Sequence, residues 1–142
     1  MAKILDGKLM AKDLTKDQTR RVAELAAKGV IPGLAVVLVG EDPASQIYVR
    51  NKGIACETVG VHSKTIRLPR SASQDEVIAA VDELNADDSI HGILVQLPLP
   101  GHLDEAAVLA RILPQKDVDG FHISNAGKLF SGQSGVVPCT PK

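Results

Sequence analysis

Tyr48 and Lys52 are the residues whose types and spacing most directly allow chemistry. They lie four positions apart in a predicted helix, which places both side chains on one helical face, about 5–6 Å apart at Cβ. A lysine acts as a general base only as the neutral amine, and burial or a nearby cation favours that form. A tyrosine beside it can share a proton or stack on a flat substrate. The spacing leaves open a plainer alternative, in which a half-buried tyrosine lies next to a solvated lysine.

Gln96 is a second candidate, because it is the only polar side chain between Ile93 and Leu97. Burying an amide costs free energy unless its hydrogen bonds are satisfied. The residue also lies at the carboxyl end of a predicted strand, where ligands bind in parallel sheets. Gln96 is therefore expected either to contact a ligand or to hydrogen-bond a neighbouring loop.

Asp117 and Asp119 form a third candidate group, just before Gly120. Two carboxylates so close together in a loop could bind a cation or accept hydrogen bonds from the edge of a guanidine-like ring. The same composition is also typical of a plain turn. We interpret His122 as incidental and Cys56 as a small helix-packing residue rather than a nucleophile.

The segments that must position these residues alternate between helix and strand. The continuous apolar run Leu34–Val39 is typical of a strand buried on both faces of a parallel sheet. Asp42 followed by Pro43 predicts a helix start, and Ser73 with Glu76 has the form of a capping box. The full set of expected elements is helices over 11–27, 42–59, after 73 and over 104–113, and strands over 34–39, 63–68 and 91–97.

This βαβα order predicts an α/β fold, a three-layer sandwich with a mostly parallel sheet and helices on both faces. Ligands in such folds bind at the carboxyl ends of the strands. That rule selects the loop after Val39, the residues around Gln96 and the loop that holds Asp119. Beyond Gly120 the periodicity fades, so we expect an irregular segment there.

The composition argues against several classes of function. The net charge is −1, with one Tyr, two Phe and no Trp, so the sequence offers neither a basic surface nor aromatic platforms for nucleic acid. No segment reaches the roughly 18 apolar residues that span a bilayer, and the N-terminus lacks the apolar run of a secretory signal. Two distant cysteines and four scattered histidines argue against disulfide or metal sites and fit a reducing cytoplasm.

Several motifs together resemble the bifunctional methylenetetrahydrofolate dehydrogenase/cyclohydrolase family. Gly40–Lys52 resembles its VG-x-[DN]-x-AS-x-x-Y-V-x-x-K signature, and Gly92–Pro100 resembles its GILVQLPLP segment. Pro114–Phe121 resembles its P-x-KDVDG block. Asn125–Leu129 and Pro138–Pro141 also match, so the resemblance covers the whole chain in the right order.

The resemblance implies two reactions at one site. In the first, 5,10-methylenetetrahydrofolate gives a hydride to NADP⁺, or to NAD⁺ in some members. In the second, water opens the resulting 5,10-methenyltetrahydrofolate to 10-formyltetrahydrofolate. By motif position, Lys52 is the acid and base of the hydrolysis, Gln96 hydrogen-bonds Lys52, Tyr48 stacks on the folate and Asp119 binds the pterin ring. The implied substrate-binding set is completed by Val95 and Leu97.

The resemblance also implies how the protein is organised. Residues 1–120 form the catalytic, folate-binding domain. Residues 121–142 form an irregular segment and hinge leading to an NAD(P)-binding Rossmann domain that this chain does not include. The cofactor is then bound by that other domain, the isolated chain lacks dehydrogenase activity, and the full protein is a cytoplasmic homodimer.

Two alternatives come from other classes of protein. The Tyr-x-x-x-Lys spacing also resembles the catalytic pair of short-chain dehydrogenases, but those enzymes need a glycine-rich nucleotide turn near the N-terminus. The sequence contains neither G-x-G-x-x-G nor G-x-x-x-x-G-K-[ST]. A non-catalytic flavodoxin-like binding module is the other alternative, and it gives no reason for a lone glutamine in a buried strand that faces Tyr48 and Lys52.

Overall fold

The computed structural model of the chain describes residues 5–139, so Thr140 and Pro141 of the last matching motif lie outside the described residues. Eight elements follow one another along this part of the chain. They are α1 (Gly7–Ala26), β1 (Gly33–Val39), α2 (Pro43–Val59), β2 (His62–Leu68), α3 (Gln74–Ala86), β3 (Gly92–Val95), α4 (Glu105–Arg111) and α5 (Ile123–Phe130).

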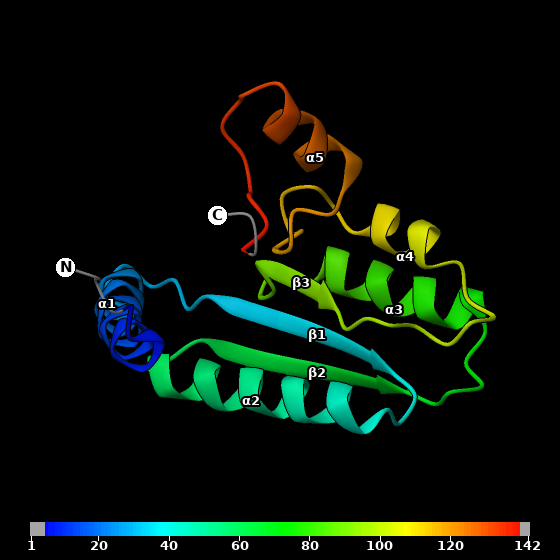
Figure 1. Cartoon of the computed structure of the whole chain (residues 1–142), viewed down its shortest axis with the longest axis horizontal. Helices are drawn as coiled ribbons and strands as arrows, with labels where there is room; N and C mark the ends of the chain where they lie inside the picture. Colours follow the sequence, from blue (N-terminus) through cyan, green and yellow to red (C-terminus); the bar gives the residue numbers. More distant parts are fainter. Residues whose placement is uncertain (1–4, 140–142) are drawn as a thin grey trace.

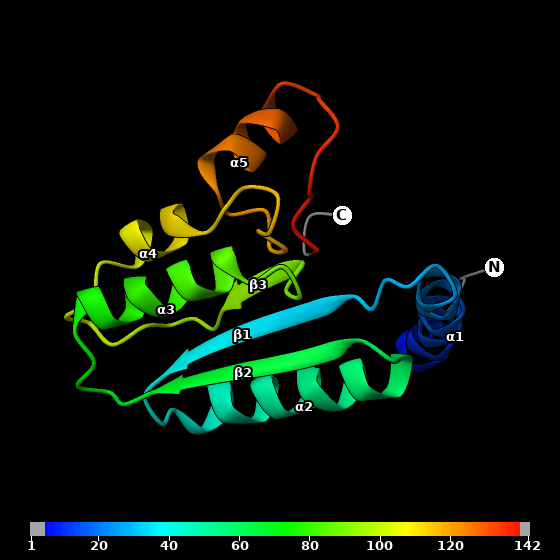
Figure 2. The ribbon, with the colours of Figure 1, turned by 180° about the vertical axis from the view of Figure 1, so that it is seen from behind.

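The three strands form one parallel sheet in the order β2-β1-β3. In Figures 1 and 2, α2 covers one face of this sheet, and α3 with α4 lies on the other. The predicted α/β sandwich with a parallel sheet and helices on both faces is therefore confirmed. Within residues 5–139, no helix combines the length and the apolar character needed to cross a bilayer.

The alternation of side chains along β1 builds two hydrophobic cores. Val36 and Leu38 pack with Val49 of α2 on one face, while Val37 and its alternate neighbours pack against α3 and α4 on the other. Successive residues of a strand point to opposite faces, so a strand covered on both sides is apolar throughout. By the same alternation in β3, the Leu94 side chain points to the α2 face. The Gln96 side chain, two residues later, points to the same face.

The helix signals read from the sequence are present. The Asp42 carboxylate accepts a hydrogen bond from the Ser45 backbone N–H at 2.8 Å, with Pro43 at the helix start. Ser73 and Glu76 form the expected capping box. The first helix begins earlier than predicted, at Gly7, because the Asp6 carboxylate accepts hydrogen bonds from the first backbone N–H groups. Glycine is a poor helix former, which hid this start.

The region after Gly120 differs from the expectation. We predicted an irregular segment from residue 121, but Ile123–Phe130 is the helix α5, so the prediction is wrong for these residues. His122 caps this helix, because its Nδ1 accepts the Ser124 backbone N–H at 3.1 Å. Asn125 is the buried residue of the helix. Ile123, Ala126 and Phe130 do recur at helical spacing, but the helix has only eight residues and contains Gly127, so the pattern was too short to indicate a helix.

The helix α1 stands at one end of the sheet in Figure 1. No residue of this helix is buried. It contacts α2, whereas α2 itself packs on both β1 and β2. The elements that carry Lys52 and Gln96 therefore belong to the packed body of the fold, and α1 lies beside it.

Candidate active site

Lys52 and Gln96 meet on the α2 face of the sheet. The Lys52 Nζ donates a hydrogen bond to Gln96 Oε1 at 3.1 Å. Gln96 Nε2 donates to the Leu97 carbonyl at 2.9 Å, and the Gln96 backbone N–H donates to the Val37 carbonyl at 2.9 Å. Because the amide nitrogen is already occupied, the amide oxygen is fixed toward the lysine. The hydrogen bond expected between these two side chains is present.

Tyr48 lies one helical turn before Lys52, and the Lys52 Nζ is 5.6 Å from the centre of its ring. This distance is within the range of a cation–π contact. The tyrosine is 59% exposed, so about half of its side chain is open to solvent. A flat molecule can reach the exposed part of the ring, and Lys52 contacts the ring from one side.

Asp119 lies in the loop between α4 and α5 and is partly buried. Burial and, after it, the neighbouring Asp117 carboxylate raise the pKa of Asp119 above its usual value of 3.8, while Lys52 acts in the opposite direction. The field of Lys52 thus reaches Asp119 from α2. We call Tyr48, Lys52, Gln96 and Asp119 together the Lys52 cluster.

Asp117 does not join this cluster. Its side chain is buried and accepts hydrogen bonds from the backbone N–H groups of Gly120 and His122 and from the Asn125 amide. The two aspartates that the sequence groups together therefore have different surroundings. Asn125 was missed as a partner of Asp117, since nothing in the sequence indicates that a helix residue eight positions later turns back to this carboxylate.

Val95 and Leu97 turn away from Lys52. Val95 is buried in the core under α3 and α4, and Leu97 packs against the same core. Their side chains lie on the opposite face from Gln96, as strand alternation requires. Only the backbone of these two residues remains for the predicted substrate contacts, and the Leu97 carbonyl already accepts a hydrogen bond from Gln96.

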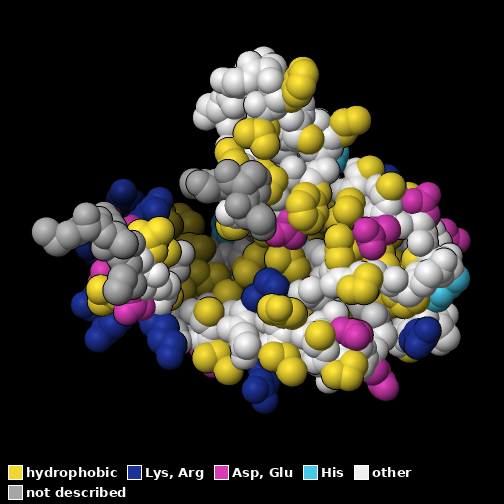
Figure 3. Space-filling model, viewed as in Figure 1, with side chains coloured by type: hydrophobic (Ala, Val, Ile, Leu, Met, Phe, Trp, Pro, Cys, Tyr) yellow, Lys and Arg dark blue, Asp and Glu magenta, His cyan; other side chains and the backbone are white. Residues whose placement is uncertain are grey.

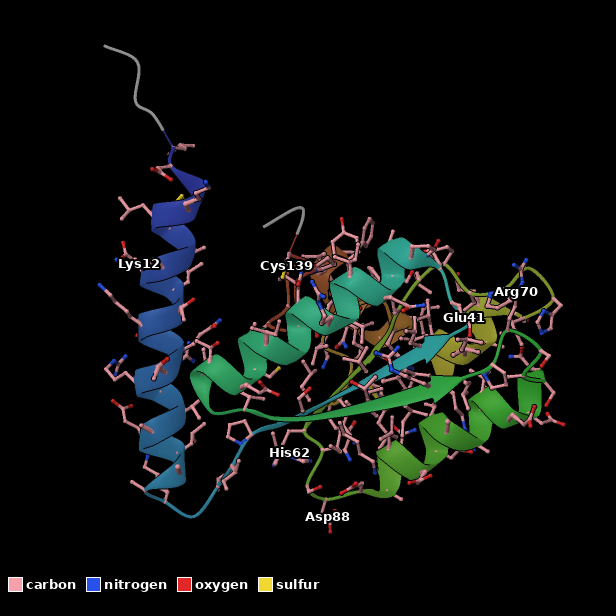
Figure 4. The ribbon with its side chains drawn as sticks, turned by 90° about the horizontal axis from the view of Figure 1, so that it is seen from below. Lys12, Glu41, His62, Arg70, Asp88 and Cys139 are labelled. Atoms are coloured by element: carbon pink, nitrogen blue, oxygen red, sulfur yellow. The ribbon has the colours of Figure 1, made fainter. Side chains whose placement is uncertain are left out.

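The carboxyl ends of the strands carry a second feature, separate from the Lys52 cluster. A cavity of about 670 Å³ is lined by residues that follow all three strands, among them Gly40, Arg70 and Pro98. Glu41 and Arg70 lie near one another at this edge in Figure 4. The strand-end rule therefore selected two different places. Gln96 contacts Lys52 of α2, while the loop after Val39 lines the cavity.

The surface is hollowed beside the amino-terminal ends of β1 and β3. In Figure 3, hydrophobic side chains line a hollow between α1 and the segment beyond β3, and a Lys or Arg side chain lies at its edge.

Within residues 5–139, no group of three His, Cys, Asp or Glu side chains is placed to hold a metal ion. Cys56 is buried, and burial raises the pKa of its thiol, in agreement with a packing role.

The turn between β1 and α2 does not fit a dinucleotide. In nucleotide-binding α/β folds, the pyrophosphate lies against backbone N–H groups at such a helix N-terminus. In this turn the Asp42 carboxylate accepts the Ser45 N–H, and Pro43 has no N–H to offer. An anionic phosphate would meet a carboxylate at this position.

Comparisons with known proteins give one consistent result. Residues 5–119 match the family described as tetrahydrofolate dehydrogenase/cyclohydrolase, catalytic domain. The bifunctional protein FolD of Phenylobacterium zucineum is 61% identical over 141 residues, which are 99% of this chain and 48% of that protein. The structure of the FolD enzyme from Campylobacter jejuni has a TM-score of 0.96 at 46% identity, covering 98% of this chain and 50% of that one.

A second similar structure is described with ligands. The Trypanosoma brucei methylenetetrahydrofolate dehydrogenase-cyclohydrolase, described as complexed with NADP cofactor and inhibitor, has a TM-score of 0.93 at 38% identity, covering 98% of this chain and 48% of that one. The chain spans about half the length of the curated relatives it matches.

Proposed function

This chain belongs to the tetrahydrofolate dehydrogenase/cyclohydrolase family, and from that premise we propose that the Lys52 cluster binds a reduced folate and moves the protons of its hydrolysis. Membership in this family sets aside the short-chain dehydrogenase and the flavodoxin-like module. The observation that carries the proposal is the hydrogen bond from Lys52 Nζ to Gln96 Oε1, which holds one amine beside an exposed tyrosine ring.

The proposed hydrolysis converts 5,10-methenyltetrahydrofolate and water to 10-formyltetrahydrofolate. Water adds to the cationic carbon between the two ring nitrogens, and Lys52 takes the proton that the water loses. The carbon–nitrogen bond of the ring then breaks and the same proton passes to the leaving nitrogen, while the hydroxyl group loses its remaining proton to solvent as the formyl C=O forms. One amine that accepts and returns a proton serves both steps, which is general acid–base catalysis. Gln96 keeps that amine in place.

Tyr48 and Asp119 are proposed to orient the substrate. The exposed ring of Tyr48 offers a flat face for the folate. The amino and ring N–H groups of a pterin form a pair of donors, and a carboxylate such as Asp119 accepts such pairs with charge-assisted hydrogen bonds. These contacts would leave the reacting carbon beside Lys52.

The accompanying oxidation is proposed to transfer a hydride from 5,10-methylenetetrahydrofolate to NADP⁺, with NAD⁺ as the alternative. The Trypanosoma brucei relative is described with bound NADP. Since the turn between β1 and α2 does not suit a pyrophosphate, we propose that the nucleotide is bound by the part of the relatives that has no counterpart in this chain. The Lys52 cluster would contribute the folate-binding wall of that reaction.

We also propose that the protein acts in the cytoplasm and that the full-length form is a homodimer, as the family resemblance implies. Two free cysteines, Cys56 and Cys139, agree with a reducing compartment. Analytical ultracentrifugation of the full-length protein tests the dimer.

The direct test of the folate site is an NMR titration of the chain with tetrahydrofolate. Saturable shifts should gather on Tyr48, Lys52 and Asp119, while signals of α1 around Lys12, which Figure 4 shows on the far helix, should stay in place. Tyr48→Ala should weaken the binding. Shifts that spread evenly over the chain, or that gather on α1, would contradict the proposal.

A further inference from the structure

Asp117 is a buried carboxylate for which the proposed chemistry has no use. It is 3% exposed. Among residues 5–139, the ion pairs join other side chains, and none includes Asp117. Burying a charge without an ion partner is costly unless hydrogen bonds replace the lost water. The buried Asp117 side chain must therefore have a specific structural role that outweighs this cost.

Hydrogen bonds from three N–H groups satisfy the carboxylate. Oδ1 accepts the Gly120 backbone N–H at 3.0 Å, and Oδ2 accepts the His122 backbone N–H at 2.9 Å and the Asn125 Nδ2 at 2.8 Å. Asn125 is itself 2% exposed and donates to the Pro114 carbonyl at 2.9 Å. An amide at position 117 could not replace the carboxylate, since its nitrogen would face one of these donors.

These bonds close the loop that carries Asp119. Gly120 and His122 are drawn back to Asp117, so residues 117–122 form a tight turn around Asp119. Gly120 has a φ of +72°, which favours glycine there. The start of the turn is fixed to the sheet, because the Ile93 N–H donates to the Lys116 carbonyl at 2.7 Å and Ile93 bridges to Asp117. The turn is thus tied to the strand that leads to Gln96.

Lys116 anchors the same turn from the other side. Its Nζ donates hydrogen bonds to the carbonyls of Leu84, Asn85 and Asp87 at the end of α3, at 2.9–3.1 Å. The backbone ahead of Asp119 therefore has two attachments that do not involve a ligand, one to β3 and one to α3. The segment that follows Asp119 depends on Asp117 and Asn125.

We propose that Asp117 is a positioning residue of the folate site: its buried carboxylate folds residues 117–122 into the turn that presents Asp119 beside Lys52. The inference rests on the proposed function only in assigning the pterin to Asp119. The negative charge of Asp117 has a second effect, because it raises the pKa of Asp119. Asp117 on the same loop and Lys52 on α2 are the charged groups that act on Asp119, and Gln96 after β3 is neutral.

Two variants separate the contributions of Asp117. Asp117→Asn removes the charge and places an amide nitrogen against an N–H donor, so at least one hydrogen bond is lost, whereas Asn125→Ala removes one donor and keeps the charge. In the chain without folate, NMR of the side-chain carboxyl carbon gives the titration midpoint of Asp119. That midpoint should fall in Asp117→Asn, because the like charge is gone, and should not fall in Asn125→Ala. Tetrahydrofolate binding should weaken in both variants, by about tenfold for the loss of one buried hydrogen bond.

The outcomes decide the inference in each case. Loss of a residue that served stability alone would lower the melting temperature and leave the folate affinity at its wild-type value, and that result would overturn the proposal. Should Asp117→Asn fail to fold, unchanged folate affinity in Asn125→Ala overturns it as well. If the wild-type chain does not bind folate but the backbone amide signals of residues 117–122 shift in Asn125→Ala, the folate assignment fails while the positioning role stands.

Discussion

Lys52 and Gln96 lie 44 positions apart in the chain, yet their side chains form a hydrogen bond of 3.1 Å. The contact exists because α2 covers the face of the sheet to which Leu94 and Gln96 point. Neither residue reaches the other through local structure. The Lys52–Gln96 pair is a product of the βαβ topology, and its geometry depends on how α2 packs on β1.

Lys52→Met should abolish hydrolysis of 5,10-methenyltetrahydrofolate in the full-length protein. Methionine keeps the length of the side chain and removes the amine that accepts and returns the proton. General acid–base groups of this kind contribute about 10²–10⁴-fold to a rate. The measurement is the loss of methenyltetrahydrofolate absorbance, together with folate affinity, which should be retained. Lys12→Met on the exposed face of α1 is the matched control, and near-normal hydrolysis by Lys52→Met would sink the assignment.

Gln96→Ala should lower the rate of hydrolysis about ten- to hundredfold with little change in folate affinity. The substitution removes the oxygen that holds the Lys52 amine, so the amine samples other positions. Steady-state kinetics should show a lower kcat at similar KM. Gln46→Ala in α2 is the control, since its side chain bonds only the Glu41 carbonyl at the helix start. A loss of stability without a loss of kcat would assign Gln96 to packing instead.

Asp119→Ala should weaken folate binding by about 2–3 kcal/mol, the scale of hydrogen bonds to a charged group. The loop itself should remain, because the hydrogen bonds that fold it belong to Asp117 and Asn125. Calorimetric titration with tetrahydrofolate gives the affinity, and circular dichroism checks the fold. A dissociation constant equal to that of the wild type would refute the pterin contact.

Asp119→Asn should stabilise the folded chain at pH 7. The pKa of Asp119 is raised above 3.8, so the folded state holds this proton more tightly than the unfolded state does. Stability from this group is then present at low pH and lost as the pH rises through the folded-state pKa. Urea unfolding should show that Asp119→Asn has the larger free energy of unfolding at pH 7 and that the advantage shrinks toward pH 4. An advantage of the same size at both pH values would mean that the charge of Asp119 is not its cause.

The chain alone should bind neither NADP⁺ nor NAD⁺ and should not oxidise 5,10-methylenetetrahydrofolate. The physical reason is the start of α2, where Asp42 and Pro43 oppose a phosphate. Calorimetry with each nucleotide and an oxidation assay make the test. Micromolar affinity for either nucleotide would show that the cofactor site lies within these residues.

The fold could be predicted from the sequence where local signals agree with packing. The apolar run of β1, the Asp42 and Ser73 caps and the motif around Lys52 each appear in the structure at the expected place. The helix α5 was missed because it is short and its apolar residues Ile123 and Phe130 stay exposed, so that the buried Asn125 and the His122 cap anchor it instead. Contacts between residues far apart in the sequence, such as those of Asn125, cannot be predicted from local sequence patterns.

The site was predictable to a similar extent. Strand alternation should have indicated that Val95 and Leu97 face away from Gln96, and the structure places them so. The separate roles of Asp117 and Asp119 had no such signal. Two aspartates in one loop look alike in a sequence, and only the positions of Gly120, His122 and Asn125 around the first distinguish them.

The position of α1 has a thermodynamic consequence. A helix with no buried residue and one packed neighbour is held by few contacts, so its opening costs less free energy than unfolding of the whole domain. The fold therefore has two levels of cooperativity. The strands, α2 and α3 unfold together, whereas α1 can fray and re-form while the Lys52–Gln96 hydrogen bond stays intact.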